Sequence, residues 1–595
     1  MLDVSAQSVI AARTRILSTC LHWVLTLFLA GLPFELMAGL PLAGLTFTNV
    51  ELLALTAIGL WVALLLEQPG LFLPRRMATG AALLLVVFVA SALLAGEWRG
   101  SALKFTARQL QGMLLGVCVA DQLSIYGWLL VRRFGLALVA GASASAACGL
   151  LEISELPAVV HVLAIFKEQP TTAGGLLRLS ATFAYANIAA MYYEAVLPIA
   201  MVACGLAQSR RGRWLLASCS VVLYLATLLT YSRAALLTAT ATVAIVALAA
   251  ALLFRRAGKS ERATRRRVIA LGGGLVVIVA GLMLLSPTFR VRLAEPDVDR
   301  WYRADYSVVP IDRLAPNELI HTPVTVRNQG LVTWRPDGVR PIRLAYHWLD
   351  AKTRLVVRYN GYRTPVPLPV DPGQLVQFDA VVQAPPQPGD YVLVWDMVSE
   401  GSGWFSERGS SIAEVAVRVA GVPAQQRLPQ SAEPAGLPQR IEVRTPPPAR
   451  PLLWGAALRL WQTHPLLGIG PDLFRHIYGP ELGLAVWDDR LHTNNLYIEL
   501  LVGSGSIGLA AFLGLVTAVG SGALRALMRL SQPHRPDERA PRLRWVLLGC
   551  ATAMAAFLIH GALDMFLEYS ATYMLLWITL GALDSLAQMN KAGTL

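Results

Sequence analysis

Apolar runs of about twenty residues occur in two parts of the chain, one before residue 290 and one after residue 495. A helix needs about twenty consecutive apolar residues to cross the hydrocarbon core of a bilayer. The run at 104–120 is the weakest, because Arg108, Gln109 and Gln111 interrupt it. The pattern predicts about twelve transmembrane helices, near 16–33, 49–67, 78–95, 104–120, 134–152, 187–206, 214–230, 233–254, 268–286, 496–518, 545–563 and 570–588.

Between the ninth and tenth runs, the pattern changes to short segments in which apolar and polar residues alternate. Such alternation is typical of strands with one buried face. Six or seven such segments within about 120 residues predict an all-β sandwich with an immunoglobulin-like arrangement. The clearest segments are 324–328, 342–348, 354–359, 375–382, 391–396 and 412–419. A Pro-rich linker at about 421–449 follows, and helical character returns at 452–461.

Basic residues collect in alternate loops between the apolar runs. One set of loops contains arginine pairs or clusters, at 75–76, 132–133, 210–213, 255–267 and 525–544. The other set contains few basic residues, mainly Arg99, Lys167 and Arg178. Short cytoplasmic loops are enriched in Lys and Arg. We therefore expect both termini in the cytoplasm and the β segment on the outer side of the membrane.

These patterns divide the chain into four parts. Residues 1–290 contain the first nine predicted transmembrane helices, and residues 291–449 contain the β-sandwich insert with its linker. Residues 450–495 form an outer loop with short helices, which carries several candidate functional residues, and residues 496–595 contain helices ten to twelve. The first apolar run leads directly into further spans, so we expect an anchor and not a cleavable signal peptide.

The composition agrees with a multi-pass membrane protein. Hydrophobic residues make up 55% of the chain and charged residues 15%, whereas a soluble domain contains about 25% charged residues. The net charge of +13 comes from loop arginines, so we expect membrane lipids and no nucleic acid as partners. None of the six cysteines lies in the β segment, which excludes a disulfide framework there.

A polar cluster lies at the mouth of the tenth predicted span. His492, Asn495 and Glu499 are spaced i, i+3 and i+7, which places them on one helix face if the helix begins near His492. Such groups are costly at a membrane rim, so the cluster predicts a functional site. The glycines at 503, 505 and 508 would let neighbouring helices approach closely.

Three arginines on the predicted outer side are candidates for binding an anion. Arg233 follows Thr-Tyr-Ser between the seventh and eighth spans, Arg178 precedes the sixth span, and Arg450 precedes Trp454 by four residues. A guanidinium binds phosphate through a planar pair of donors and stays charged. Each also has a structural alternative, as a capping or snorkelling residue, a hydrogen-bonding loop residue and a juxtamembrane arginine, respectively.

Other polar residues receive structural interpretations. Gly-Ile-Gly-Pro-Asp at 468–472 predicts a tight turn that brings Phe474 and Arg475 near the outer site, and not a dinucleotide fingerprint. The remaining histidines lack metal-ligand spacing and the serines lack a nucleophile elbow, so we expect no metal and no cofactor. Most of the acidic residues in or near spans are expected to be paired near helix ends, with no functional role; these acidic residues are Asp121, Glu152, Glu194, Asp564 and Glu568.

The order of these motifs resembles the O-antigen ligase and polymerase superfamily of bacterial envelope proteins. The resemblance covers about 1–290 as architecture and 450–520 as motifs, and the β insert is not part of the minimal pattern. One departure is Asn494, where many members have a second histidine. The motifs are Thr-Tyr-Ser-Arg-Ala at 230–234, Arg450 with Trp454, the Gly-Ile-Gly turn within 465–474, His492 with Asn495, Tyr497 and Glu499, and Gly505 with Gly508.

The resemblance implies a membrane glycosyltransferase that takes a glycan from undecaprenyl pyrophosphate to an acceptor hydroxyl, on lipid A–core or similar, at the periplasmic face of the bacterial inner membrane. We expect inversion and no metal requirement. The family's essential residues map onto Arg233, Arg450 and His492 as catalytic residues. The arginines would neutralise the departing pyrophosphate, and His492 would accept the hydroxyl proton near neutral pH. The expected substrate-binding residues are Arg178, Asn495, Tyr497, Glu499 and Trp454.

Other functions stay open at this point. A polymerase of lipid-linked repeat units or a protein O-oligosaccharyltransferase would carry the same motifs and differ in its glycan, lipid or protein acceptor. A polysaccharide transporter or flippase predicts repeats with helices broken at mid-membrane, and the sequence shows no such symmetry. Aromatic residues of the β segment could stack on a sugar, but a place in the sandwich core is favoured; they are Trp334, Trp348, Trp395, Trp404 and Phe405.

Overall fold

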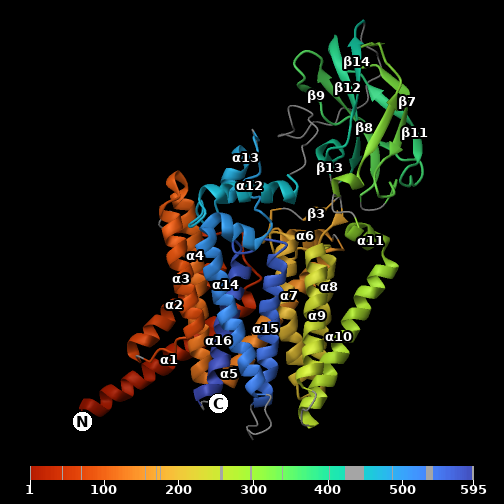
Figure 1. The fold of residues 1–595 in the computed structure, drawn as a ribbon. Helices are drawn as coiled ribbons and strands as arrows, with labels where there is room; N and C mark the ends of the chain where they lie inside the picture. Colours follow the sequence, from red (N-terminus) through yellow and green to blue (C-terminus); the bar gives the residue numbers. More distant parts are fainter. Residues whose placement is uncertain are drawn as a thin grey trace. The chain divides into compact units, whose positions relative to one another are not determined.

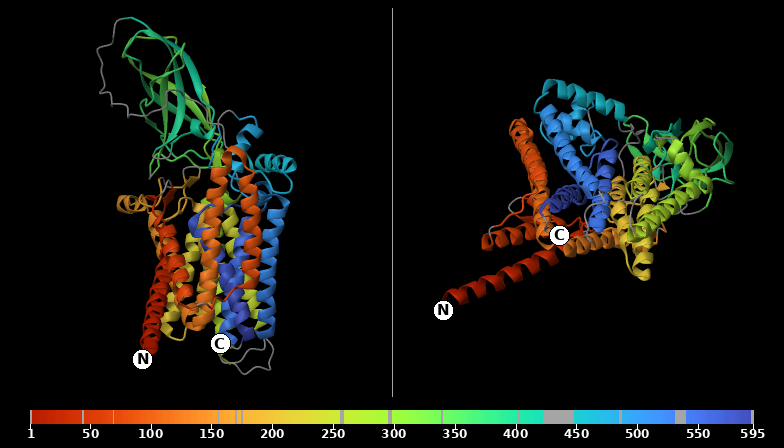
Figure 2. Two further views of the ribbon diagram at one scale, coloured as in Figure 1. Left: turned by 90° about the vertical axis from the view of Figure 1, so that its left-hand side faces the viewer. Right: turned by 60° about the horizontal axis from the view of Figure 1, so that its bottom comes forward.

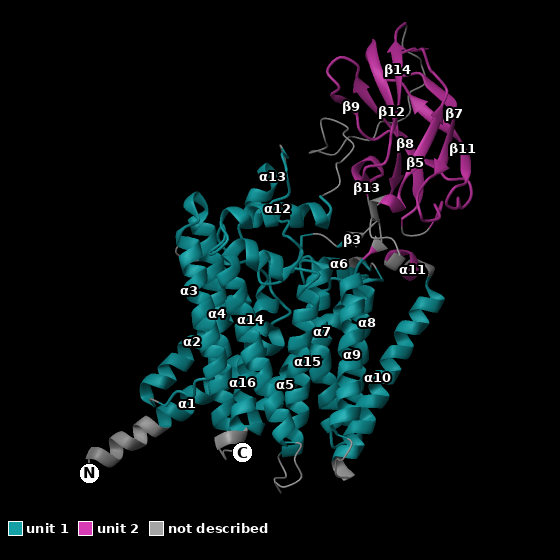
Figure 3. Cartoon of the chain, viewed as in Figure 1, with its two compact units in different colours: residues 1–171, 178–286, 448–595 teal, residues 172–177, 287–447 magenta. Residues whose placement is uncertain are grey.

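In a computed structural model, the chain forms two compact units (Figure 3). The helical unit contains residues 1–171, 178–286 and 448–595, and the β unit contains residues 172–177 and 287–447. The predicted Pro-rich linker lies almost wholly at 422–447, outside the described residues. The structure describes residues 2–42, 45–68, 70–154, 156–168, 171–173, 176–254, 259–294, 298–337, 340–400, 403–421, 448–484, 487–530 and 540–592.

The helical unit is a bundle of long helices with short helices at one end (Figure 1). The long helices are α1 (Leu2–Gly31), α2 (Asn49–Glu67), α3 (Arg75–Leu93), α4 (Arg99–Tyr126), α5 (Trp128–Glu152), α7 (Ala186–Leu206), α8 (Arg210–Leu229), α9 (Arg233–Leu253), α10 (Lys259–Leu285), α14 (Leu496–Leu530), α15 (Ala540–Gly561) and α16 (Ser570–Ala592). The short helices of this unit include α6 (Pro157–Leu163), η1 (Gly96–Trp98), α12 (Arg450–Thr463) and α13 (Phe474–Glu481).

Among the described residues, 11 helices are long and apolar enough to cross a membrane. The predicted count of twelve is not confirmed, because α4 is 28 residues long but is not one of them. Polar side chains of α4 form hydrogen bonds inside the bundle. Gln109 donates a hydrogen bond to the Leu567 carbonyl at 2.8 Å and accepts one from Trp577 at 3.1 Å. These contacts fix α4 against the start of α16 and the segment before it.

Helices α7 and α16 lie in the interior of the bundle (Figure 2). In their apolar windows, 89% and 94% of the residues are buried, more than in any other candidate span among the described residues. Helices α16 and α4 pack very closely, since a Cβ added to Gly581 would lie 2.2 Å from the Gly116 carbonyl oxygen. The connection that precedes α16, residues 562–569, is therefore attached at its end to a buried helix.

The β unit contains two sheets. The larger has the strand order β10-β8-β12-β14-β6, with β9 on β8 and β13 on β12, and the smaller has the order β11-β7-β5. All pairings are antiparallel except that of β14 with β6. The strands are β5 (Ala304–Val308), β6 (Arg313–Leu314), β7 (Leu319–Asn328), β8 (Ile342–Asp350), β9 (Val356–Arg358), β10 (Thr364–Pro365), β11 (Leu375–Gln383), β12 (Gly389–Ser399), β13 (Gly403–Trp404) and β14 (Ala413–Val419).

Each of the six predicted strand segments overlaps an observed strand. Residues of both sheets share one apolar core, which includes Val326 of β7, Phe378 of β11 and Leu393 of β12. The immunoglobulin-like arrangement stays a prediction. All five aromatic residues considered for sugar stacking are at most 5% exposed, and four of them belong to this shared core, so the assignment of most of them to the core is confirmed; Trp404 lies instead in a separate small cluster with Ala345, Tyr359 and Val398. Outside the two sheets, short pairs form between β1 (Leu40–Leu42) and β2 (Leu45–Phe47), and between β3 (Thr172–Ala173) and β4 (Leu176–Leu177). The β unit also contains α11 (Pro287–Ala294), η2 (Val298–Trp301) and η3 (Ser406–Arg408).

Candidate functional site

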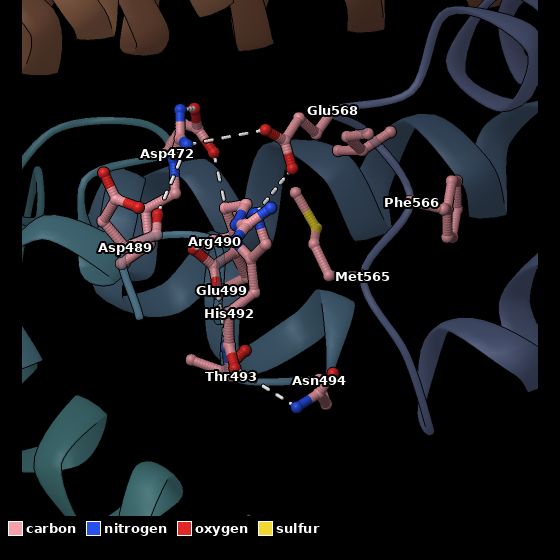
Figure 4. Close-up of polar contacts among 12 residues, drawn as sticks. Asp472, Asp489, Arg490, His492, Thr493, Asn494, Glu499, Met565, Phe566 and Glu568 are labelled. Atoms are coloured by element: carbon pink, nitrogen blue, oxygen red, sulfur yellow. Dashed lines mark hydrogen bonds and ion pairs between the residues drawn. The ribbon is translucent and has the colours of Figure 1, made fainter. Parts of the chain in front are cut away.

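A cluster of ionisable side chains lies where α14 begins and α15 ends (Figure 4). Its members, here called the His492 cluster, are His492, Glu499, Glu568, Asp472 and Arg475. They come from three separate segments: the glycine turn with the first turn of α13, the loop and first turn of α14, and the 562–569 connection between α15 and α16. The fold therefore assembles this cluster from residues that are up to about a hundred positions apart.

The glycine turn before α13 is held against a break in α14. Gly505 has a φ of 68° inside α14, so the helix is interrupted there. Beside the break, the backbone N–H groups of 469–470 donate hydrogen bonds to the carbonyls of 502–503. A Cβ on Gly505 would lie 2.1 Å from the Leu466 carbonyl oxygen, so only glycine fits. The predicted tight turn is confirmed, and it brings Arg475 to the cluster.

The spacing of the His492 motif does not come from one helix face. Helix α14 begins at Leu496, and Asn494 has a left-handed φ of 51°, so His492 lies in the preceding loop. The loop turns back over the first helical turn. Glu499 accepts a hydrogen bond from the Thr493 backbone N–H at 3.0 Å and lies 3.4 Å from His492. The predicted shared helix face is therefore wrong, although the two ionisable side chains do meet.

Three predicted substrate-binding residues hold the loop and helices together. Asn495 caps α14, because its Oδ1 accepts from two N–H groups of the first turn, and its Nδ2 donates to a carbonyl after α15. Tyr497 donates to a carbonyl near the end of α15 at 2.7 Å. Trp454 donates from α12 to the Thr493 carbonyl at 2.8 Å. These contacts give each residue a structural role, and their binding roles stay predictions.

Carboxylates lie on both sides of the His492 ring. Nε2 lies 2.8 Å from Glu568, Nδ1 lies 3.4 Å from Glu499, and Nδ1 is 3.9 Å from Asp472. Burial opposes a charge on the ring, but the hydrogen bonds and charges of Glu499 and Glu568 outweigh it and raise the pKa of His492 well above its usual value. Both ring nitrogens face carboxylates, and the role of His492 as proton acceptor stays a prediction.

Glu568 is the more accessible member of its pair with His492. Its side chain is 23% exposed, whereas that of His492 is 5% exposed. Burial alone would raise the pKa of Glu568, but its hydrogen bond to His492 and the charges of His492, Arg475 and Arg108 outweigh burial and lower the pKa. Glu568 is therefore an ionised, oriented carboxylate that a bound molecule can reach.

Asp472 and Arg475 complete the cluster. Arg475 pairs with Asp472 at 2.9 Å and with Glu568 at 3.6 Å. Burial raises the pKa of Asp472 to about 6, although the charges of His492 and Arg475 favour its ionised form. Among the described residues, Arg475 Nε and Asp472 Oδ1 are buried without a hydrogen-bond partner. The hydrogen-bonding capacity of these two atoms is therefore unused within the cluster.

A second polar group contains one of the predicted arginines. Arg178 donates to the Thr230 carbonyl at 2.7 Å and to Asn187 at 2.6 Å, and Asn187 in turn donates to Asp564 at 2.6 Å. Thr230 begins the predicted Thr-Tyr-Ser-Arg motif. Arg233 is exposed at the first residue of α9, just after this turn. The loop arginine and the motif turn, distant in sequence, thus lie together.

The other predicted arginine belongs to a region near the end of α15. Arg450 is the first residue of α12 and lies within electrostatic range of His560. His560 forms a buried hydrogen bond with Glu194 of α7, so the expectation that Glu194 is paired is confirmed. The convergence of Arg233, Arg450 and His492 on one point stays a prediction.

The 562–569 connection contributes to both polar groups. Asp564 contacts Asn187 in the arginine group, and Glu568, four residues later, contacts His492. The sequence assigned these two acids only to pairing near helix ends, and both are indeed paired. The sequence does contain a signal for Asp564 and Glu568. Two acids lie in one short connection between apolar runs, where each acid requires a partner.

The fold and the cluster define a class: a multi-pass membrane protein that carries a buried acid–base cluster and an arginine group at one end of its helices. Residues 419–513 match the family described as O-Antigen ligase, a range that contains α12, α13 and the His492 motif. This match supports the assignment of the chain to the O-antigen ligase superfamily, which the order of its motifs predicted. No curated protein shows significant similarity to the chain.

Proposed function

We propose that this protein transfers a glycan from undecaprenyl pyrophosphate to an acceptor hydroxyl, of lipid A–core or a similar molecule, at the periplasmic face of the bacterial inner membrane. The observation that carries the proposal is the 562–569 connection, whose Asp564 contacts the arginine group and whose Glu568 contacts His492. Such a transfer needs cationic groups for a departing anion next to a group that removes a proton. The 562–569 connection links the arginine group to the His492 cluster.

The arginines act on the donor. Arg178, Arg233 and Arg450 are the proposed ligands of the pyrophosphate, because a guanidinium offers paired donors to phosphate oxygens and remains charged. Asn187 fixes one side of Arg178 and is itself fixed by Asp564. An oriented cation needs little rearrangement when negative charge develops on the leaving group.

The His492 cluster acts on the acceptor. The geometry favours Glu568 as the proton acceptor, since both ring nitrogens of His492 face carboxylates and Glu568 is the more exposed partner. His492 remains a cation and orients Glu568 through the 2.8 Å hydrogen bond. A carboxylate with a lowered pKa is a weak base, but it suffices once the acceptor hydroxyl has begun to bond to carbon and has become acidic.

The proposed step is a single displacement. The bond between the anomeric carbon and the pyrophosphate oxygen breaks, and its electron pair leaves with the phosphate. The acceptor oxygen forms a new bond to the anomeric carbon from the opposite face, and its proton passes to Glu568. The products are an inverted glycoside and undecaprenyl pyrophosphate, so no oxidant or reductant takes part.

The test is a transfer assay with the purified full-length protein in lipid vesicles. The donor is an undecaprenyl-pyrophosphate-linked oligosaccharide, and the acceptors, tested separately, are lipid A–core, a second lipid-linked unit and a serine-containing peptide. Arg233→Ala and Arg450→Ala should each lower the rate by roughly 100-fold or more. Arg459→Ala is the matched control, because Arg459 lies on α12 but pairs with Glu481 at the surface.

The acceptor that is used distinguishes a ligase from a polymerase or a protein oligosaccharyltransferase. The rate should be the same with and without a chelator, and the product should have inverted anomeric configuration. The proposal fails if no acceptor is glycosylated by the wild-type protein, or if both arginine variants retain the wild-type rate.

A further inference from the structure

A cavity lies near the end of the bundle that is opposite to the His492 cluster. It has a volume of about 650 Å³ and is lined by α4, α5, α7, α8, α15, α16 and Leu29 of α1. Arg542 lines it from the first turn of α15, whereas the last residue of α15, Gly561, leads into the connection that bears Glu568. At about 1.5 Å per residue, these two ends of α15 are roughly 28 Å apart. The cavity is therefore separate from the His492 cluster.

The cavity combines an apolar interior with a cationic edge. Its interior is formed by side chains such as Leu138, Val202 and Ile578. Arg132 and Arg542 are the charged residues among its described lining, which contains no acid. Both arginines are exposed. The Arg542 guanidinium carbon lies 5.7 Å from the ring centroid of Trp128. Tryptophan and arginine are typical of the level of lipid headgroups.

We propose that this cavity binds one anionic phospholipid, with an acyl chain in the apolar interior and its phosphate between Arg132 and Arg542. Charge complementarity favours this occupant over a zwitterionic lipid, because two cations and no acid in the described lining leave a positive edge. The volume lies within the range of about 300–1,000 Å³ that is usual for small-molecule sites. An acyl chain matches the apolar interior, and a phosphate matches a pair of guanidinium groups.

The experiment uses the purified full-length protein after removal of lipid with detergent. An equimolar mixture of phosphatidylglycerol and phosphatidylcholine is added, and the lipid retained per protein molecule is counted by native mass spectrometry. The wild-type protein should retain one phosphatidylglycerol, with a preference of roughly tenfold over phosphatidylcholine. Arg132→Ala with Arg542→Ala should abolish this preference. The matched control, Arg525→Ala with Arg529→Ala, removes two exposed arginines of α14 that do not line the cavity and should preserve it.

Cys550 reports the position of the bound lipid, because it lines the cavity whereas the other five cysteines do not. In a variant that retains only Cys550, phosphatidylglycerol should slow labelling by N-ethylmaleimide at least fivefold, and inorganic phosphate should not. Ala582→Trp narrows the cavity and keeps both arginines. It should reduce retention even if the double arginine variant does not fold.

The proposal is overturned if the wild-type protein retains the two lipids equally, or if the arginine variant keeps the preference. It is also overturned if phosphatidylglycerol leaves the labelling of Cys550 unchanged. None of these measurements depends on glycan transfer, so the lipid site and the proposed function can fail separately.

Discussion

His492 and Glu568 are 76 residues apart in the sequence, and their side chains share a 2.8 Å hydrogen bond between Nε2 and a carboxylate oxygen. The histidine comes from the loop before α14, and the glutamate comes from the connection between α15 and α16. Glu499 lies at the other ring nitrogen, and the two carboxylates raise the pKa of the buried His492 ring well above its usual value. The geometry of the pair therefore favours His492 as the residue that orients Glu568, and Glu568 as the residue that accepts the proton.

The transfer rate should fall as the pH drops through about 6. Asp472 has a pKa of about 6, raised mainly by burial, and below this pH it becomes neutral. Arg475 then loses one partner and binds Glu568 more strongly, which makes Glu568 a weaker base. In Asp472→Asn, this transition near pH 6 should be absent, and the rate at pH 7 should resemble the low-pH rate of the wild-type protein. A pH–rate profile between about pH 5 and pH 8 checks this, with Glu481→Gln as control.

Asp472 also affects the stability of the fold, and the direction in which this effect changes with pH can be measured. The raised pKa means that the folded state binds the proton of Asp472 more tightly than the unfolded state, whose reference value is 3.8. The contribution of this group to stability is therefore present at low pH and is lost as the pH rises from 3.8 through about 6. In thermal unfolding, the difference between Asp472→Asn and the wild-type protein should grow over this interval in favour of the variant. A difference that does not change with pH would contradict the assignment.

Asn187 should influence donor binding through Arg178. Asn187→Leu removes the acceptor of one Arg178 hydrogen bond and the donor to Asp564. Because hydrogen bonds to charged groups contribute about 1.5–3 kcal/mol, the loss predicts a roughly 10- to 100-fold decrease in kcat/KM, expressed mainly in the KM for the donor. Arg178→Lys, which keeps the charge but not the paired donors, should show a similar donor defect. Unchanged donor kinetics in both variants would remove Arg178 from the site.

Asn495 should act on stability more than on chemistry. Asn495→Ala removes the cap of α14 and should destabilise the fold by about 1 kcal/mol. Asn495→Asp keeps the capping oxygens and should recover most of this loss. Thermal unfolding of the two variants in the same detergent measures the difference. Equal destabilisation by Ala and Asp would show that the cap does not account for the effect.

Much of the fold follows from periodicity. Twenty-residue apolar runs and two-residue alternation predicted the helices and the main strands, because both depend on burial along one segment. What periodicity leaves open depends on contacts between segments. The weakest run became α4, whose Gln109 is satisfied by Leu567 and Trp577, and no local pattern shows such partners.

The site shows the same division. The sequence identified His492 and Glu499 from their spacing, but it assumed one helix face, whereas the left-handed Asn494 and the start of α14 at Leu496 place the histidine in a loop. Glu568 could not be selected, because its role depends on a partner 76 residues away. Proximity in the folded chain, not residue type, made it a candidate.

Gly505 should tolerate no side chain. Gly505→Ala would place a Cβ 2.1 Å from the Leu466 carbonyl oxygen at a φ of 68°, which predicts a destabilisation of roughly 2–4 kcal/mol. Gly514→Ala is the matched control in the same helix, since a Cβ there meets nothing within 4 Å. The control should be neutral or slightly stabilising. Similar melting temperatures for both variants would contradict a structural break at Gly505.

The most direct test of the central claim is the rate of glycan transfer by Glu568→Gln and His492→Ala. Each variant is first shown to have the melting temperature of the wild-type protein, and Glu481→Gln is the control. Glu568→Gln keeps the size of the side chain but cannot accept the proton, and His492→Ala removes the group that orients it. Both should lower the rate by roughly 100-fold or more, and the double variant should be little slower than either single variant, because the two residues act as a unit. Transfer by Glu568→Gln at the wild-type rate would contradict the account.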